Sequence, residues 1–74
     1  MPIASGIYRH FKGRYYLVLG EARHSETDEI MVVYQPLYGE PHWFVRPKAM
    51  FEETVEHEGR MQPRFQFIGS SQPE

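Results

Sequence analysis

The chain contains no cysteine, so neither a disulfide framework nor a thiolate zinc site can stabilise it. It also lacks a run of about 18 apolar residues, the length that crosses a membrane, and its first ten residues lack the apolar stretch of a secretory signal. These absences favour a cytoplasmic protein with no membrane partner. With 74 residues, of which 41% are apolar and 15% aromatic, the chain has room for one small domain held together by aromatic packing.

The chain has little excess of either charge, since its formal net charge is only −2, but the charged residues are unevenly distributed along it. Residues 1–23 carry a net charge of +3, whereas residues 24–59 carry −6. Non-specific binding of duplex nucleic acid depends on neutralising many phosphates, so the acidic balance argues against a duplex partner. The basic N-terminal third is still compatible with a local anion site.

Helical periodicity is missing over any long window, and β-branched and aromatic residues come in short runs, which predicts an all-β fold. We predict a bulge at Gly20, a tight turn at Gly13, a hairpin turn at Glu58-Gly59 and a loop over residues 24–29. Pro47 suits the first position of a helical turn over residues 47–50. The expected strands cover residues 6–12, 14–23, 30–34, 42–46 and 51–57, with a last strand around Phe65 and Phe67.

Five or six short strands and one short helical turn predict a small, partly open SH3-like barrel, because closing a sheet removes exposed edges. An open two-layer sheet and an OB-type barrel fit the same spacing. We expect a single domain over residues 1–74, ordered from about residue 6 to 68, with residues 69–74 as a frayed tail.

A candidate binding face follows from the first strand. Alternation places Tyr8, His10 and Lys12 on one face, opposite Ile7 and Phe11, which we take as core residues. Later loops and strands add hydroxyls, aromatic rings and a guanidinium, the groups that recognise an anionic planar ligand or an extended peptide. The predicted ligand-binding set is Tyr8, His10, Lys12, His24, Ser25, Thr27, Tyr38, Trp43 and Arg46.

Two members of this set also fit a purely structural role. Trp43 shares a strand face with Val45 and could be the principal core residue, since large aromatic side chains dominate small cores. Arg46 could cap backbone carbonyls or pair with Glu52 or Glu53. The sequence leaves both alternatives open.

Catalytic and metal chemistry have weaker support. The four histidines lie in four separate predicted elements with no short-range pair, so we predict no metal site and no cofactor. His24-Ser25 does place a base beside a hydroxyl, and His10 or His24 assisted by Glu26 or Asp28 could serve a small hydrolase or nucleotide-modifying enzyme. Turn formation is the competing interpretation of this loop, because Ser, Thr and Asp bond their own backbone readily. We therefore predict no catalytic residue.

Several short motifs together carry a resemblance to a known family. They are Tyr8-Arg9-His10-Phe11-Lys12-Gly13, Val18-Leu19-Gly20 with Ala22, His24-Ser25-Glu26-Thr27, Val32-Val33-Tyr34, Leu37-Tyr38-Gly39, Trp43 with Val45-Arg46-Pro47, Met50-Phe51 and Pro63-Arg64-Phe65. From about Gly6 to Ile68, the chain resembles the short bacterial family catalogued as domain of unknown function 1653. The resemblance implies a small, single-domain, mostly β protein and carries no activity.

Three function hypotheses remain. The first is a non-catalytic binding module whose aromatic and basic groove holds an anionic small ligand, single-stranded nucleic acid or a peptide. The second is the small enzyme described above. The third is a structural or assembly domain that forms a dimer or docks on a larger protein through an exposed strand edge.

Overall fold

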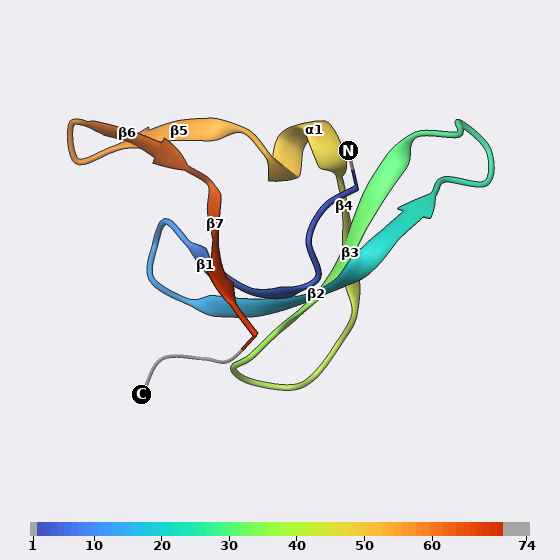
Figure 1. Cartoon of the computed structure of the whole chain (residues 1–74), viewed down its shortest axis with the longest axis horizontal. Helices are drawn as coiled ribbons and strands as arrows, with labels where there is room; N and C mark the ends of the chain where they lie inside the picture. The colour runs from blue at the N-terminus through green and yellow to red at the C-terminus, as the bar shows by residue number, and fades with distance from the viewer. Residues whose placement is uncertain (1, 71–74) are drawn as a thin grey trace.

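A computed structural model describes residues 2–70 of the chain. These residues form seven strands and one short helix (Figure 1). The elements are β1 (Gly6–His10), β2 (Tyr15–Arg23), β3 (Ile30–Pro36), β4 (Phe44–Pro47), α1 (Lys48–Phe51), β5 (Thr54–His57), β6 (Arg60–Pro63) and β7 (Phe65–Gly69). Within this part of the chain, no helix has the length and apolar character needed to cross a membrane.

The strands form a five-stranded antiparallel sheet in the order β4-β3-β2-β1-β7 and a separate hairpin of β5 and β6. The all-β prediction is confirmed, but over residues 2–70 both sheets are open and no closed barrel forms. The chain runs from β4 through α1 into the β5–β6 hairpin and returns only with β7, which pairs with β1. The edges of the larger sheet are therefore β4 and β7, and α1 with the hairpin lies along one side of it (Figure 1).

The predicted turns are confirmed. Gly13 has a φ of +106° in the turn between β1 and β2, and Glu58 and Gly59 have φ values of +54° and +77° between β5 and β6. Two successive positive φ values are those of a type I′ turn, whose twist matches the strands that it joins. Residues 24–29 form the predicted loop between β2 and β3.

The predicted bulge in β2 is also confirmed. The pairing of β2 with β3 shifts between Val18 and Gly20, so Glu21, opposite Val32, lies on the same face as Val18, opposite Tyr34. This change of face brings the Glu21 carboxylate to the inner side of the sheet. There it accepts a hydrogen bond of 2.7 Å from the Ile3 amide and forms an ion pair of 2.8 Å with Lys48 of α1.

The core lies on the inner face of the five-stranded sheet. Phe51 of α1 is 1% exposed and stacks face to face on Phe65, with ring centroids 4.1 Å apart. Burying such a ring stabilises the fold by about 1.5–3 kcal/mol. The buried cluster comprises Tyr8, Val18, Val32, Tyr34, Phe51 and Phe65.

The exposure predicted for Tyr8 is wrong, whereas Lys12 is exposed as predicted and His10 is half-buried. Tyr8 is only 6% exposed, packs in the core and donates a hydrogen bond of 2.8 Å from its hydroxyl to the Ala4 carbonyl. Ile7 on the opposite face is buried as well, whereas Phe11 lies in the following turn and is half-buried. Alternation identifies which side chains share a face, but not which face the rest of the chain covers.

Several element boundaries also differ from the predictions. Strand β4 begins at Phe44, so His42 precedes it, and β5 begins at Thr54 and not at residue 51. The helix α1 covers Lys48–Phe51, one residue later than expected at both ends, with Pro47 as its N-cap. The expected last strand is two strands in different sheets, separated at Arg64. Gly69 pairs with Ile7 as the last residue of β7 and so does not belong to a tail, while residues 71–74 of the expected tail lie outside the described residues.

Candidate functional site

Four residues of the predicted binding set, His10, Lys12, Tyr38 and Arg46, lie in one network of ring contacts. His10 and Arg46 lie against Phe65, Tyr38 contacts Tyr16, and the Lys12 ammonium lies 5.8 Å from the centroid of Phe11, beside His10. The structure adds Arg14, Tyr16, Tyr34 and Phe65, which were not in the predicted set. We call these eight residues the basic aromatic surface.

The aromatic rings of this surface form a continuous set of contacts. Tyr16 of β2 lies at its centre, with its ring centroid 5.4 Å from that of Phe65, 5.7 Å from Tyr34 and 5.6 Å from Tyr38. All three contacts are edge-to-face, the arrangement that the ring quadrupoles favour. Because the rings support one another, their positions are set before any ligand binds.

Cations are distributed over the same rings. The Arg14 guanidinium lies 4.3 Å from the centroid of Tyr38, and that of Arg46 lies 5.8 Å from the centroid of Phe65. Arg46 also donates from Nε to the Tyr34 hydroxyl at 3.4 Å. Within residues 2–70, neither arginine nor Lys12 forms an ion pair with a carboxylate. Their charges are therefore not offset by a neighbouring acid.

The pKa of His10 is affected by the local excess of positive charge. Its ring packs edge-on against Phe65, at 4.9 Å between centroids, and its Nδ1 accepts a hydrogen bond of 3.1 Å from the Lys12 amide. Burial lowers the pKa of His10, and the charges of Arg64, Lys12 and Arg46 lower it further. An imidazole among three cations and without an orienting carboxylate is poorly suited to act as a general base near neutral pH.

The tyrosine hydroxyls complete the surface. The Oη atoms of Tyr16 and Tyr38 are 2.7 Å apart and share a hydrogen bond. Burial and this hydrogen bond raise the pKa of Tyr16 to about 12. The Tyr16 hydroxyl thus keeps the proton that it needs to donate a hydrogen bond, to Tyr38 or to an anion.

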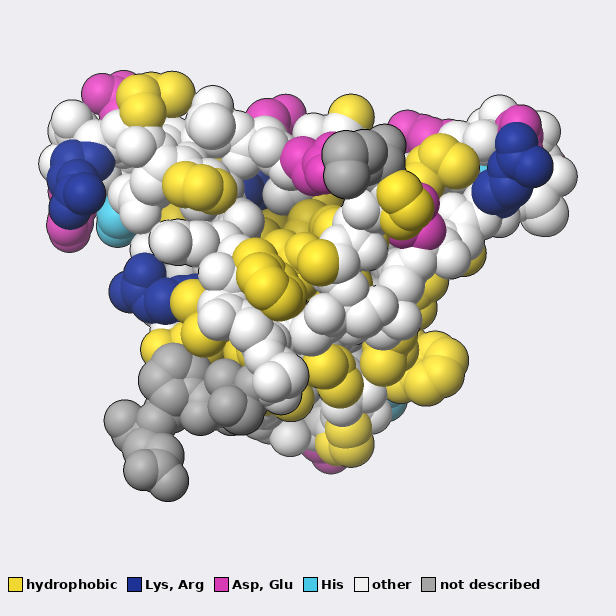
Figure 2. Space-filling model, in the orientation of Figure 1, with side chains coloured by type: hydrophobic (Ala, Val, Ile, Leu, Met, Phe, Trp, Pro, Cys, Tyr) yellow, Lys and Arg dark blue, Asp and Glu magenta, His cyan; other side chains and the backbone are white. Residues whose placement is uncertain are grey.

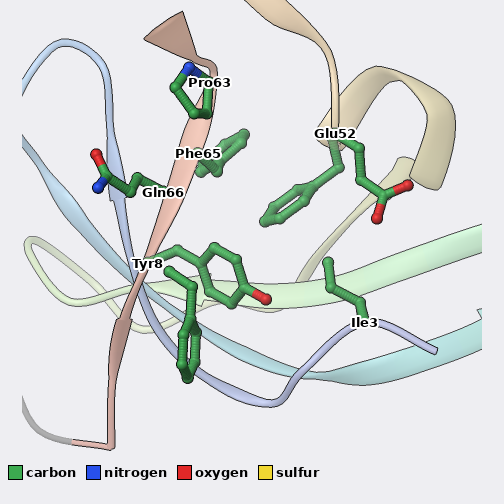
Figure 3. A pocket seen from close by; sticks show the side chains of 8 residues that line it. Ile3, Tyr8, Glu52, Pro63, Phe65 and Gln66 are labelled. Carbon is green, nitrogen blue, oxygen red and sulfur yellow. The ribbon is translucent and has the colours of Figure 1, made fainter. Parts of the chain in front are cut away.

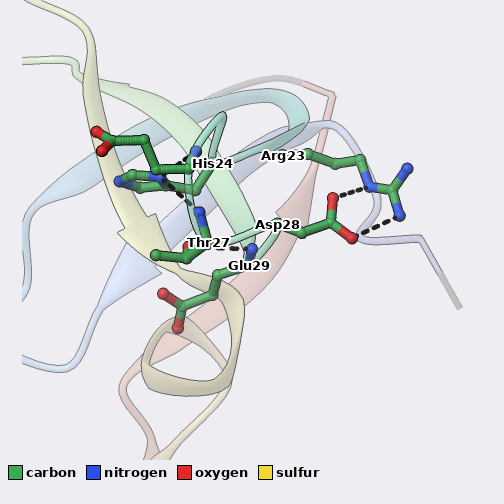
Figure 4. Close-up of polar contacts among 6 residues, drawn as sticks. Arg23, His24, Thr27, Asp28 and Glu29 are labelled. Carbon is green, nitrogen blue, oxygen red and sulfur yellow. Dashed lines mark hydrogen bonds and ion pairs between the residues drawn. The ribbon is translucent and has the colours of Figure 1, made fainter.

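The loop between β2 and β3 holds three further predicted residues, His24, Ser25 and Thr27, at a different place. His24 accepts hydrogen bonds at Nδ1 from the amides of Glu26 and Thr27, at 3.1 and 3.4 Å (Figure 4). The Thr27 hydroxyl accepts from the Glu29 amide at 3.3 Å. The turn interpretation of this loop is supported, with His24 and not Ser25 as the residue that bonds the backbone donors.

The two histidines proposed for catalysis do not converge. His10 lies beside the start of β2 and His24 follows its end, so the nine residues of β2 separate them. At about 3.3 Å per residue this separation is roughly 30 Å. The carboxylate of Asp28 is paired with Arg23 at 2.9 Å, and it therefore does not orient His24 (Figure 4).

Trp43 also lies apart from the basic aromatic surface. Its side chain is 71% exposed, and its Nε1 donates a hydrogen bond of 2.9 Å to Gln35. Gln35 alternates with the inward-facing Tyr34 on β3, so Trp43 lies over the outer face of the sheet. The alternative that Trp43 forms the core is wrong. Arg46 pairs with neither Glu52 nor Glu53.

A pocket of about 300 Å³ lies elsewhere on the inner side, between the N-terminal segment, α1 and β7. Apolar side chains gather at the centre of this face of the molecule, with acidic side chains beside them (Figure 2). Pro63 and Gln66 lie at one side of the pocket and Glu52 and Ile3 at the other (Figure 3). The lining residues are Ile3, Tyr8, Phe51, Glu52, Pro63, Phe65, Gln66 and Phe67.

Only Tyr8 of the predicted binding set lines this pocket. The sequence signal was limited, because the lining comes from the N-terminal segment, α1 and β7, whose proximity depends on the pairing of β7 with β1. Strand alternation alone predicts that Tyr16 and Val18 share a face of the sheet. No local sequence pattern predicts that Phe65 and Arg64 lie close to that face. Within residues 2–70, no group of three or more His, Cys, Asp and Glu side chains is placed to hold a metal ion.

Comparison with known proteins places this geometry in a family. The model of the family described as "protein of unknown function (DUF1653)" matches residues 6–67. The chain is also similar to the crystal structure of a DUF1653 protein from Bordetella bronchiseptica, with 43% identity, a TM-score of 0.91, and coverage of 97% of this chain and 95% of that one. Among curated proteins, none matches. The family match spans most of the chain and agrees with the resemblance seen in the sequence, so the chain belongs to the DUF1653 family.

Proposed function

We propose that this chain is a non-catalytic binding module whose basic aromatic surface takes an anionic ligand with a planar ring. The observation that carries the proposal is that Arg14 lies over Tyr38 and Arg46 over Phe65, with Lys12 near His10. None of these three cations forms an ion pair with a carboxylate within residues 2–70. A phosphate or carboxylate would meet two guanidinium groups and an ammonium, and a ring would stack on tyrosine.

The ligand that combines these features most simply is a nucleotide unit, either free or within a single strand. Stacking of a base on an aromatic side chain contributes about 1–3 kcal/mol and tolerates any base, because every base has a π-face. Duplex nucleic acid fits less well, since its bases are already stacked and the chain as a whole is acidic. We also propose that the chain acts in the cytoplasm, as the sequence analysis leads us to expect.

Catalysis is the weaker reading of the same residues. His10 already accepts a backbone hydrogen bond at Nδ1 and has cations, not a carboxylate, beside it. Hydrolysis requires a base in contact with a nucleophile and with an orienting acid, and the surroundings of His10 do not provide this arrangement.

The test is a chemical-shift titration of the 15N-labelled chain with a nucleoside monophosphate and, separately, with an eight-nucleotide single strand. We expect shifts at His10, Tyr16, Tyr38 and Arg46, and affinity about tenfold weaker in Arg46→Gln, because a hydrogen bond to a charged group contributes about 1.5–3 kcal/mol. Tighter binding of the eight-nucleotide strand than of the nucleoside monophosphate would indicate that the ligand is a single-stranded nucleic acid and not a free nucleotide.

The matched control is Arg9→Gln. Arg9 lies on the same strand as His10 but on its other face, so the substitution removes one positive charge without touching the basic aromatic surface. Equal weakening of binding by Arg46→Gln and Arg9→Gln would mean that binding depends only on total charge. Either that result or chemical-shift changes confined to other residues would refute the proposed site.

The exposed edge strand β4 supports a second candidate function, association with another copy of the chain. Trp43, Phe44 and Val45 at this edge are 71, 49 and 60% exposed. An unpaired apolar edge is a template for another strand. Sedimentation analysis should then find a dimer that Val45→Lys dissociates, and a monomer at high concentration would eliminate this candidate.

A further inference from the structure

The pocket between α1 and β7 differs in chemistry from the basic aromatic surface. Its lining combines aromatic rings with a carboxylate at the rim, that of Glu52. Within residues 2–70, Glu52 forms no ion pair with a cation. An anion has no positively charged side chain to meet among these lining residues.

The rings of the pocket stand nearly at right angles to one another. Tyr8 meets Phe51 at 73° and Phe67 at 62°, with centroid distances of 5.4 and 5.3 Å. These distances are those of rings in edge-to-face contact with one another, so a ligand cannot enter between them. A cation would instead lie against the exposed ring of Phe67, because an aromatic face carries the negative part of the ring quadrupole.

Three of the rings are held rigidly by the core. Tyr8, Phe51 and Phe65 are at most 7% exposed, whereas Phe67 is 49% exposed. Burial raises the pKa of Tyr8, and the charge of Glu52 raises it further, so this carboxylate acts on the pocket lining. The lining thus combines three buried rings with one exposed ring and one exposed carboxylate, and Figure 3 shows Glu52 on the side of the pocket away from Gln66.

We infer that this pocket binds an alkylated ammonium group, with the exposed Phe67 ring against the cation and the Glu52 carboxylate as its counter-charge. A volume of about 300 Å³ is at the lower end for ligand sites, which suits a headgroup and not a whole cofactor. A trimethylammonium group fits better than a primary ammonium, because a primary ammonium is strongly hydrated and loses more on entering an apolar site.

The same headgroup occurs in small quaternary amines and in the side chain of trimethylated lysine. The shared chemistry is a weakly hydrated cation on an apolar stem. An aromatic ring and one carboxylate recognise this cation without hydrogen bonding. The affinity of the site should therefore not depend on the chemical group at the far end of the stem.

The experiment compares choline with 3,3-dimethyl-1-butanol, in which a neutral carbon replaces the charged nitrogen at nearly the same shape. We expect choline to shift the amides of Glu52, Gln66 and Phe67 in 15N-labelled protein, and the neutral alcohol to bind about tenfold more weakly. A peptide with one trimethyl-lysine, beside its unmodified form, separates the two sources of the headgroup. Equal binding of choline and the alcohol would show an apolar pocket with no preference for cations, which would overturn the inference.

Two variants report on the pocket without removing a core ring. Glu52→Gln keeps the shape and removes the charge, and Phe67→Leu replaces the exposed ring with an aliphatic side chain. Each should weaken choline binding about five- to tenfold. Glu56→Gln is the matched control, because Glu56 is an exposed acid on β5 outside the pocket. Unchanged affinity in Glu52→Gln would refute the assigned counter-charge.

This inference and the proposed function can fail separately. Arg46→Gln should leave choline binding unchanged, and Glu52→Gln should not weaken binding of the nucleoside monophosphate. Loss of choline binding in Arg46→Gln at an unchanged thermal midpoint would place the cation site elsewhere and contradict the inference.

Discussion

The salt dependence of single-strand binding tests the count of available cations on the basic aromatic surface. Three cations there, Lys12, Arg14 and Arg46, have no ion pair to a carboxylate in the described part of the chain. If each meets one phosphate, the logarithm of the association constant should fall against the logarithm of salt concentration with a slope of about −2. Raising salt from about 50 to 200 mM should therefore weaken binding about 20-fold.

Removing one cation should lower that slope by about 0.7. For Arg46→Gln, the same increase in salt should weaken binding only about sevenfold. Fluorescence anisotropy of a labelled eight-nucleotide strand measures the slope, and Arg9→Gln again controls for total charge. A slope near zero, or the same slope in the wild-type and Arg46→Gln proteins, would refute the assignment of phosphate contacts to these residues.

Three further predictions concern the fold. Phe51→Ala should lower the free energy of unfolding by about 3–5 kcal/mol, measured by urea denaturation, because it empties the centre of the core; a loss below about 1 kcal/mol would contradict this. Gly6→Ala should also destabilise the chain, by about 1–3 kcal/mol, since φ is +137° and the new Cβ would lie 2.7 Å from the Gly69 oxygen; an unchanged thermal midpoint would argue against this geometry. The lowered pKa of His10 means that the unfolded chain binds its proton first, so this part of the stability is complete above about pH 6.5 and is lost as pH falls toward the folded pKa; urea midpoints of wild type and His10→Gln should converge on acidification, and a constant difference would refute it.

Local features of the fold were predictable because their causes are local. Gly13 and Glu58-Gly59 mark turns through the backbone conformations that they adopt, and Gly20 marks a bulge for the same reason. Pro47 likewise places the helical turn next to β4. The separation of β6 from β7 was not predictable in this way, because the bend at Arg64 reflects a change of partner strand, which depends on residues far away in the sequence.

The basic aromatic surface was predictable only in part. Alternation grouped Tyr8 with His10 correctly, yet both side chains point to the inner face, where Phe51 and Phe65 bury Tyr8. The sequence contains no local signal that these two rings return to cover the first strand. For Trp43 the error was the opposite one, since the alternative of a core residue is wrong: Trp43 precedes the edge strand β4 and its ring stays exposed.

The pairing of β1 with β7 joins Ile7 to Gly69, so the largest sheet is completed by contacts that span nearly the whole described chain. Such non-local pairing slows folding to the range of milliseconds to seconds, because a long loop must close before the contacts form. Phe65 enters with β7 and lies in both the ring cluster and the pocket. Neither the basic aromatic surface nor the pocket is therefore complete until β7 pairs with β1, and we expect a ligand bound at either place to slow hydrogen exchange of the amides in this pairing.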